Sequence, residues 1–112
     1  MNDDDAAPRL IVTDPRGRRM IPIDKPLLTL GRCSETDVRV PGAGVSRVHA
    51  EIVTENGVSR LRDCASRFGT FVNGERTAEQ VLAHGDHITL GQSDDTEIIF
   101  VIGDDAPSQE RS

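Results

Sequence analysis

The sequence contains no tryptophan or tyrosine and only three phenylalanines among its 112 residues. Its core must therefore rest on valine, isoleucine and leucine, and a composition of β-branched and aliphatic side chains suits a pleated sheet. A chain of this length makes one domain, which on folding buries roughly two thirds of the surface that the unfolded chain exposes. We expect a single compact domain built mainly of strands.

Cysteine is scarce as well. Cys33 and Cys64 are too few for the disulfide framework of a small secreted protein, and neither has a metal-ligating partner at close spacing. The segment His84-Gly85-Asp86-His87 resembles a metal motif only superficially, because a Gly-Asp turn between two strands explains it more simply. We therefore predict two free thiols, no bound metal and no cofactor.

The sequence also lacks a long apolar run. No segment approaches the roughly 18 apolar residues that a membrane-spanning helix needs, and the N-terminus, Met1-Asn2-Asp3-Asp4-Asp5, is acidic where a secretion signal would be basic. A net charge of −6 argues against a nucleic-acid partner. Lys25 is the only lysine beside twelve arginines, a bias that indicates a GC-rich bacterial genome. We expect a soluble, cytoplasmic, bacterial protein with no membrane or nucleic-acid partner.

The acidic charge gathers at the two ends of the chain. Residues 1–8 and 103–112 carry five of the six net negative charges and are rich in Asp, Ala, Pro and Ser. Such segments lack the apolar side chains that a core needs. We predict a disordered acidic N-terminal tail over residues 1–8, a folded domain over 9–102, and a disordered tail or the start of a linker over 103–112. Arginine is concentrated between residues 31 and 76.

Turn formers separate short apolar segments throughout the predicted domain. Asp14-Pro15-Arg16-Gly17 predicts a hairpin turn, and Pro22, which has no N–H to donate, then belongs on an edge strand or at a free position. Asn56-Gly57 and Asn73-Gly74 each lie between apolar segments, the strongest local signal for a hairpin.

Other segments complete the pattern. We expect further strands at residues 27–30, 38–40, 88–90 and 98–102, whereas residues 77–83 are the one segment compatible with a short helix. Brief strands with regular turn signals are typical of an all-β, two-sheet antiparallel β-sandwich, here of about 10–11 strands.

Three fragments place arginines or hydroxyl groups beside glycines and turn-prone positions. They are Gly31-Arg32, the segment 46–50 (Ser-Arg-Val-His-Ala), and Asp63 with the segment 66–74 (Ser-Arg-Phe-Gly-Thr-Phe-Val-Asn-Gly). A guanidinium offers a planar fork that matches two phosphate oxygens, and hydroxyl groups donate to a third. The fragments therefore predict loops that bind a phosphate group.

In order and spacing, these fragments resemble the forkhead-associated (FHA) domain. The matching motifs are Gly31-Arg32, Ser46-x-x-His49, Asp63-x-x-Ser66, Gly69-Thr70-x-Val72-Asn73-Gly74, and Gly85-Asp86-x-Ile88 with Leu90-Gly91. The resemblance covers about residues 9–102. It implies an FHA/SMAD-like β-sandwich whose loops at one end bind phosphothreonine in a partner protein, the product of a Ser/Thr kinase. It implies a recognition module and not an enzyme, a monomer that stands alone or forms part of a larger signalling protein.

The resemblance also assigns roles by position. It implies Arg32 as the main phosphate ligand and Ser46 as a hydroxyl donor, with Arg47 and Arg67 adding contacts. Phe68, the next residue in the same segment, completes the expected phosphopeptide-binding set. His49 is implied to bond across the loops and hold Ser46 in place. The residues that support the site by their architecture are Gly31, Gly69, Thr70 and Asn73.

One position departs from the family pattern. The commonest family signature has Asn immediately before the Gly-Thr pair, where its amide hydrogen-bonds the ligand backbone, and this chain has Phe68 instead. A phospho-independent interaction or self-association domain with a degenerate pocket is therefore the alternative function. A catalytic triad of Ser46, His49 and Asp63 is disfavoured, because the sequence has neither a nucleophile elbow nor an oxyanion motif.

Overall fold

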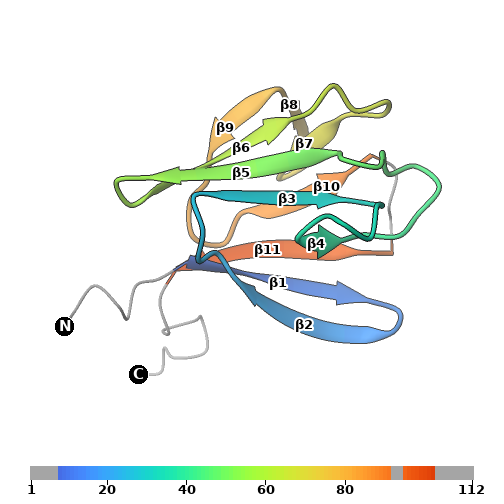
Figure 1. The fold of residues 1–112 in the computed structure, drawn as a ribbon, viewed down its shortest axis with the longest axis horizontal. Helices are drawn as coiled ribbons and strands as arrows, with labels where there is room; N and C mark the ends of the chain where they lie inside the picture. Colours follow the sequence, from blue (N-terminus) through green and yellow to red (C-terminus); the bar gives the residue numbers. More distant parts are fainter. Residues whose placement is uncertain (1–7, 92–94, 103–112) are drawn as a thin grey trace.

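The computed structural model describes residues 8–91 and 95–102, and within them every regular element is a β-strand. Eleven strands form two sheets that pack face to face (Figure 1). The strand order is β2-β1-β11-β10-β7-β8 in the six-stranded sheet and β4-β3-β5-β6-β9 in the five-stranded sheet. The structure thus confirms the predicted all-β, two-sheet sandwich.

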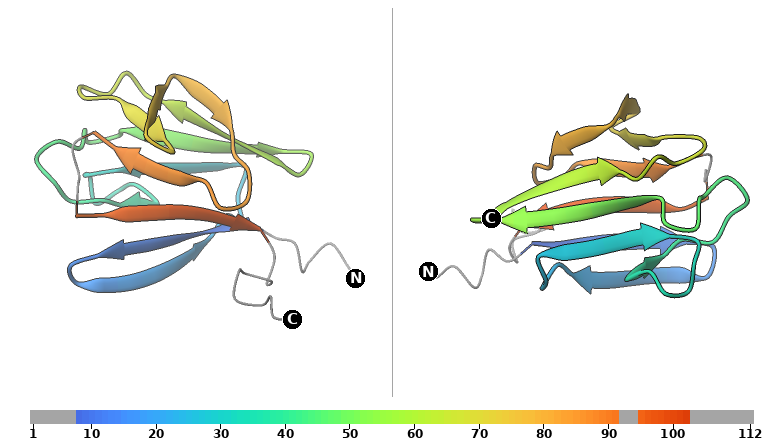
Figure 2. Two further views of the ribbon diagram at one scale, coloured as in Figure 1. Left: turned by 180° about the vertical axis from the view of Figure 1, so that it is seen from behind. Right: turned by 45° about the horizontal axis from the view of Figure 1, so that its top comes forward.

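The six-stranded sheet contains β1 (Pro8–Asp14), β2 (Gly17–Pro22), β7 (Thr70–Val72), β8 (Glu75–Thr77), β10 (His87–Leu90) and β11 (Glu97–Ile102). The five-stranded sheet contains β3 (Leu27–Gly31), β4 (Val38–Arg39), β5 (Ala50–Glu55), β6 (Val58–Asp63) and β9 (Glu79–Val81). Figure 2 shows the two layers from behind and with the top turned forward. Neighbouring strands pair antiparallel, but β3 and β4 are parallel, a departure from the purely antiparallel prediction.

The three predicted hairpins are confirmed. β1 pairs with β2 across the Asp14–Gly17 turn, and β2 is an edge strand, as Pro22 requires. At the β5–β6 turn Asn56 and Gly57 have φ of 53° and 79°, and at the β7–β8 turn Asn73 and Gly74 have φ of 53° and 87°. Two successive positive φ angles are what a two-residue hairpin turn of type I′ needs.

The prediction that residues 77–83 could form a short helix is wrong. β8 ends at Thr77, and β9 follows almost at once as the edge strand beside β6. A seven-residue segment is too short to be a stable helix in isolation, so the pairing offered by β6 decides its conformation. Arg60 faces Val81 in this pairing, and its Nε lies 3.3 Å from a carboxylate oxygen of Glu79.

The two predicted tails lie outside the described residues, except that Pro8 begins β1. None of the described residues forms a helix that is long and apolar enough to cross a membrane.

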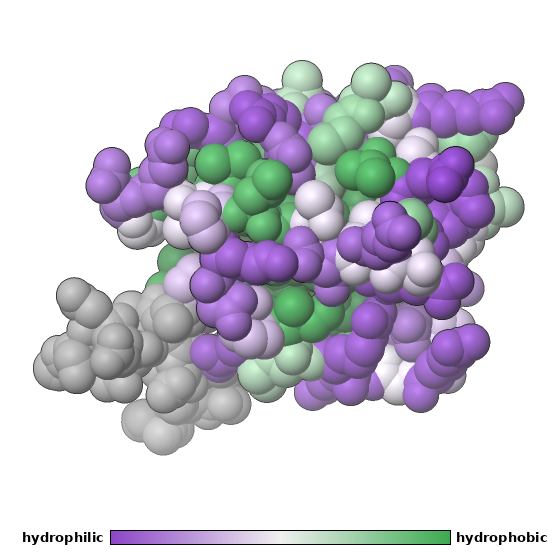
Figure 3. Space-filling view, in the orientation of Figure 1, coloured by the Kyte–Doolittle hydropathy of each residue, from purple (hydrophilic) through white to green (hydrophobic). Residues whose placement is uncertain are grey.

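The core lies between the two sheets and is aliphatic, apart from one aromatic side chain. The fully buried side chains include Phe100, Leu10, Leu30, Ile52, Leu61, Ile88, Leu90 and Ile98. On the face viewed in Figure 3, hydrophilic residues surround separate hydrophobic patches. In β6 the alternation is regular, since Ser59 and Leu61 face inward while Val58 is exposed.

The loops between β3 and β4, β4 and β5, and β6 and β7, which carry the predicted phosphate-binding residues, lie at one end of the sandwich (Figure 1). Pro8 and Ile102 pair with each other at the opposite end. The fold therefore leaves the motif-bearing end accessible.

Candidate functional site

The loops between β3 and β4, β4 and β5, and β6 and β7 enclose an open cleft of about 400 Å³. Its lining residues are Arg32, Ala43, Gly44, Val45, Ser46, Arg47, Val48, Arg67 and Phe68. All five residues that the sequence analysis expected to contact a ligand are among them. Because three arginines and no carboxylate line the cleft, it is suited to an anion.

Arg32 lies directly after β3 and is held by the facing loop. Its backbone N–H donates to the Ser46 carbonyl at 3.0 Å, and its side-chain Nε donates to the Val45 carbonyl at 3.1 Å. The first bond holds the backbone, and the second fixes one edge of the guanidinium. The terminal nitrogens make no hydrogen bond or ion pair with any residue in the described part of the chain. Arg32 therefore presents an oriented fork whose outer donors are available.

Gly31 allows the close approach on which this arrangement depends. A Cβ atom at residue 31 would lie 2.2 Å from the carbonyl oxygen of Arg47, an impossible contact with backbone. The same carbonyl accepts the N–H of Cys33 at 3.1 Å. Only glycine lets the two strands of backbone meet so closely, which brings Arg32 beside Ser46.

The hydroxyl of Ser46 is oriented by the next loop. Its Oγ accepts the backbone N–H of Arg67 at 3.1 Å. A serine hydroxyl has one proton to donate, and this contact leaves that proton unused. Ser46 can therefore donate to an anion in the cleft while it ties the β4–β5 loop to the β6–β7 loop.

The buried side chain of His49 links the β4–β5 loop to the β6–β7 loop. Its side chain is fully buried, and Nδ1 accepts the N–H of Ser46 at 3.0 Å. Since Nδ1 is an acceptor, Nε2 carries the proton and donates to the Gly69 carbonyl, 2.7 Å away. The ring thus bonds across the loops in the way the resemblance implied.

Asp63 and Ser66 shape the β6–β7 loop, and the sequence analysis did not count them as site residues. One carboxylate oxygen of Asp63 accepts the hydroxyls of Ser66 and Thr70, the latter at 2.6 Å, and the other accepts the Ser66 N–H at 3.1 Å. The Ser66 Oγ in turn accepts the Gly69 N–H at 3.0 Å. Burial acts to raise the pKa of Asp63, but the hydrogen bonds from Ser66 and Thr70 outweigh it and hold the pKa below its usual value. The Asp-x-x-Ser spacing was the available signal.

Gly91 is a further supporting residue that was missed, although the Leu90-Gly91 pair belongs to the quoted motifs. Its φ is 61°, and a Cβ atom there would lie within 1.9 Å of the Gly44 carbonyl oxygen. Its N–H donates to the Gly69 carbonyl at 2.8 Å. The φ of Gly69 is 92°, and its carbonyl accepts hydrogen bonds from both the His49 ring and the Gly91 N–H.

Arg47, Arg67 and Phe68 form the exposed rim of the cleft. The guanidinium carbon of Arg67 lies 5.5 Å from the centroid of the Phe68 ring, within the range of a cation–π contact. Phe68 keeps 36% of its surface exposed, and Val48 nearby keeps 46%. The rim therefore combines exposed cations with an apolar surface.

Asn73 lies away from the cleft, at the other end of β7. Its amide donates to Asp86 at 3.0 Å, and its carbonyl oxygen accepts the His87 N–H at 3.0 Å. These bonds tie the β7–β8 turn to the loop before β10. Asn73 thus stabilises the fold, and among the predicted supporting residues it is the one placed far from the site.

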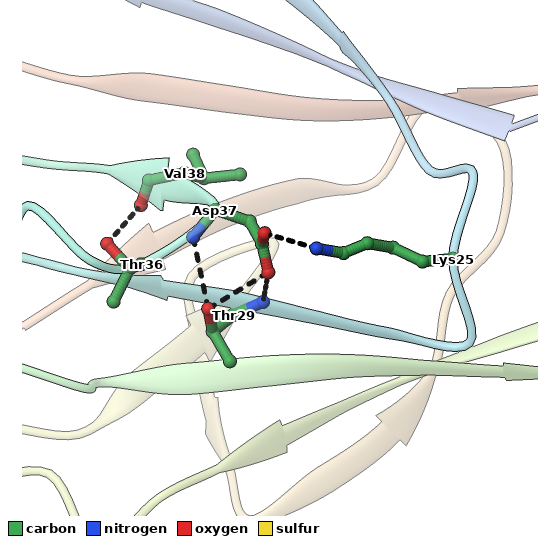
Figure 4. Close-up of polar contacts among 5 residues, drawn as sticks. All are labelled: Lys25, Thr29, Thr36, Asp37 and Val38. Carbon is green, nitrogen blue, oxygen red and sulfur yellow. Dashed lines mark hydrogen bonds and ion pairs between the residues drawn. The ribbon is translucent and has the colours of Figure 1, made fainter.

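A network around Asp37 closes the loop between β3 and β4 (Figure 4). One Asp37 oxygen accepts the N–H and hydroxyl of Thr29 at 2.9 and 3.0 Å, and the other lies 2.7 Å from the Lys25 ammonium. The hydrogen bond from Lys25 is the main cause that lowers the pKa of Asp37. The Thr36 hydroxyl lies 3.3 Å from the Val38 carbonyl oxygen. The loop that carries Arg32 is thus fastened to β3, a role that the sequence analysis did not identify.

The arrangement does not support catalysis by Ser46, His49 and Asp63. His49 bonds the backbone N–H of Ser46 and not its hydroxyl, and Asp63 bonds Ser66 and Thr70. Among the described residues, no group of three or more His, Cys, Asp or Glu side chains is placed to hold a metal ion.

Both cysteines beside the cleft are free thiols. Burial is the main cause that raises the pKa of Cys64, and the carboxylates of Glu51 and Asp63 raise it further. Thiolate is therefore scarce at Cys64.

Comparison with known proteins agrees with this geometry. A model of the FHA domain matches residues 28–91, more than half of the chain. An oxoglutarate dehydrogenase inhibitor of Corynebacterium diphtheriae is 35% identical over 81 residues, which cover 72% of this chain and 54% of that protein. The glycogen accumulation regulator GarA of Mycolicibacterium smegmatis is 35% identical over 81 residues, 72% of this chain and 49% of that protein. The chain therefore spans about half the length of these relatives.

A solved structure from a study of phosphothreonine-dependent FHA domain interactions has the same fold. It aligns with a TM-score of 0.76 and 36% sequence identity, and the alignment covers 85% of this chain and 95% of the other.

Proposed function

The chain belongs to the FHA domain family of phosphothreonine-dependent binding modules, and from that premise we propose that Arg32 and Ser46 bind the phosphate of a phosphothreonine in a partner protein. The observation that carries the proposal is the cleft itself, lined by three arginines and an oriented hydroxyl with no carboxylate among its lining residues. A phosphothreonine brings about −1.5 to −2 charges and three strong acceptor oxygens. The relatives are an inhibitor and a regulator, and this chain too is a binding module and not an enzyme.

Each proposed ligand has donors to spare. The Nε of Arg32 is used internally, so its terminal nitrogens donate to two phosphate oxygens, and the Ser46 hydroxyl donates to a third. Three charge-assisted hydrogen bonds give roughly 5–9 kcal/mol gross. Ordering an extended peptide takes back several kcal/mol, so we expect a reversible interaction of about micromolar affinity.

Arg47 and Arg67 have a different part in the proposal. They lie on the rim, and their guanidinium groups make no hydrogen bond or ion pair with the residues that the structure describes, so these groups can contact the bound peptide. Phe68 supplies apolar contact beside them where the common family pattern has an amide. The partner we propose is a protein phosphorylated by a Ser/Thr kinase, bound by a monomer whose folded module spans residues 9–102.

Calorimetric titration with a phosphothreonine peptide and its unmodified twin tests this function. We expect binding of the phosphopeptide only, and loss of that binding in Arg32→Ala. Arg60→Ala is the control, because Arg60 is also an exposed arginine but lies on the outer face of β6. Equal affinity for both peptides would refute phosphate recognition.

Phe68 favours one other function, a phospho-independent interaction or self-association surface. With Val48 it exposes apolar area on the rim, and it has no group that could hydrogen-bond a ligand backbone. In that case Phe68→Ala abolishes partner binding and Arg32→Ala does not. The two variants together therefore separate the two functions.

A further inference from the structure

A second arginine-lined cleft lies beside the first at the same end of the sandwich. It has a volume of about 230 Å³ and is formed by the β1–β2 turn, the start of β2, and Arg39 and Pro41 at and after the end of β4. Its lining residues are Asp14, Arg16, Gly17, Arg18, Arg19, Arg39 and Pro41. We call this the β2–β4 cleft. Four arginines thus face a single carboxylate.

A series of hydrogen bonds connects the β2–β4 cleft to Arg32. A terminal nitrogen of Arg19 donates to the carbonyl of Arg39 at 3.0 Å, and the Nε of Arg39 donates to the carbonyl of Arg32 at 3.2 Å. In the sheet Arg39 pairs with Gly31, the residue before Arg32. The two clefts are therefore neighbours on one surface, joined through Arg39.

The positive charge of the β2–β4 cleft is not balanced within it. One oxygen of Asp14 accepts the backbone N–H of Arg16 at 2.9 Å, and the other lies a long 3.8 Å from Arg19. The guanidinium groups of Arg16 and Arg18 make no hydrogen bond or ion pair with any described residue. Gathering like charges on one surface raises the local potential, which an anion would relieve.

We propose that the β2–β4 cleft binds aspartate or glutamate side chains that flank the phosphothreonine in the same partner chain. The inference rests on the proposed function, because it takes the phosphothreonine bound at Arg32 as its anchor. The cleft is smaller than the one at Arg32, about 230 against 400 Å³, and the one anion already in it is the carboxylate of Asp14. A guanidinium fork matches a carboxylate in the same bidentate way as a phosphate.

An extended peptide reaches from one cleft to the other within a few residues. Because Gly31 and Arg39 are partners in adjacent strands, they lie about 4.8 Å apart across the sheet. Arg19 and the β1–β2 turn lie one further contact away. At about 3.3 Å per residue, three or four extended residues span roughly 10–13 Å. We therefore expect the acidic residues three or four positions from the phosphothreonine.

The experiment compares four peptides by calorimetry at low and high salt. One carries phosphothreonine with neutral flanks, two carry a pair of aspartates three and four positions before or after it, and the fourth is an acidic peptide without phosphate. We expect one of the acidic phosphopeptides to bind roughly three- to tenfold tighter than the neutral one at low salt. High salt should shrink this gain, since exposed charges are screened.

The variant Arg16→Gln/Arg18→Gln tests whether the gain arises in the β2–β4 cleft. Both side chains are exposed, so the variant should fold, which its thermal midpoint checks. We expect it to lose the gain from acidic flanks and to bind the neutral phosphopeptide within about twofold of wild type. Arg60→Gln, on the distant outer face of β6, should keep both affinities.

Equal binding of acidic and neutral phosphopeptides, or a gain that survives in Arg16→Gln/Arg18→Gln, would overturn the inference. Failure of the proposed function has a separate signature, because then the acidic phosphopeptides bind no better than the acidic peptide without phosphate.

Discussion

Single side chains in the Arg32 cleft are positioned by backbone groups of neighbouring loops and not by one another. Arg32 is held by the carbonyl of Val45, Ser46 by the N–H of Arg67, and His49 by the carbonyl of Gly69. The first two contacts leave the terminal nitrogens of Arg32 and the hydroxyl proton of Ser46 available. Donors fixed before binding lose less conformational entropy when the ligand arrives, which favours affinity.

Ser46→Ala removes both a phosphate donor and the acceptor of the Arg67 N–H. A hydrogen bond to a charged group is worth about 1.5–3 kcal/mol, so we expect a phosphopeptide affinity roughly 10- to 150-fold weaker. Calorimetry measures this loss, with Ser34→Ala as control, since Ser34 is exposed in the adjacent loop. An affinity within about twofold of wild type would remove Ser46 from the ligand set.

Asp63 makes the stability of the β6–β7 loop depend on pH. Its folded-state pKa lies below the usual 3.8, so the ionised form is favoured in the folded protein. The resulting stabilisation is fully present above about pH 5 and is lost as the pH falls through 3.8 and then through the folded-state value. We expect the difference in unfolding free energy between wild type and Asp63→Asn to shrink over that acidic range. Urea denaturation measures it, and a difference that does not change with pH would contradict this role.

At the level of residues, the sequence predicted which side chains line the cleft better than which residues support it. Arg32, Ser46 and His49 carry distinctive chemistry in a recognisable order, so their place was predictable. Asp37 and Gly91 act only through contacts with segments distant in sequence, Thr29 and Gly44 among them. The sequence alone does not reveal such contacts between distant segments.

Loops are the elements that make the site, and glycines let them pack against one another. At Gly91 the β10–β11 connection meets the β4–β5 loop so closely that no side chain fits. Gly57 also has a positive φ, of 79°, but a Cβ atom there would meet nothing within 4 Å. Comparing substitutions at these two glycines therefore separates the effect of a steric clash from the effect of backbone strain.

Gly91→Ala should destabilise the protein by about 2–4 kcal/mol, since it adds a clash with backbone to the strain of a positive φ. Gly57→Ala should lower the free energy of unfolding by only about 1 kcal/mol, because it adds backbone strain without a clash. Chemical denaturation of both variants measures the difference. Equal losses of unfolding free energy in the two variants would mean that the close contact between residue 91 and Gly44 does not affect stability.

Hairpins were the elements most predictable from sequence, because Asn-Gly turns are determined locally. The parallel pairing of β4 with β3 was not predictable, since β4 has only two residues and its loop is fastened by the Asp37 network. The possible helix at residues 77–83 failed for a related reason. Its conformation is determined by pairing with β6 and not by its own sequence.

For the whole molecule, charge distribution matters more than net charge. The chain carries −6 overall, yet the Arg32 cleft and the β2–β4 cleft hold seven arginines and one carboxylate between them. A local basic surface on an acidic protein discourages long polyanions and still attracts a short anionic segment. The sandwich presents that surface at one end, with Pro8 and Ile102 paired at the other (Figure 1).

The measurement that tests the central claim most directly is an NMR titration of the isotope-labelled protein with a phosphothreonine peptide and its unmodified twin. Binding at the Arg32 cleft predicts that the phosphopeptide shifts the backbone amides of Arg32, Ser46 and Arg67, the last because it donates to the Ser46 hydroxyl. The unmodified peptide should leave them unchanged. Shifts confined to the outer sheet face, for example at Val53 and Val81, or identical shifts with both peptides, would contradict the account.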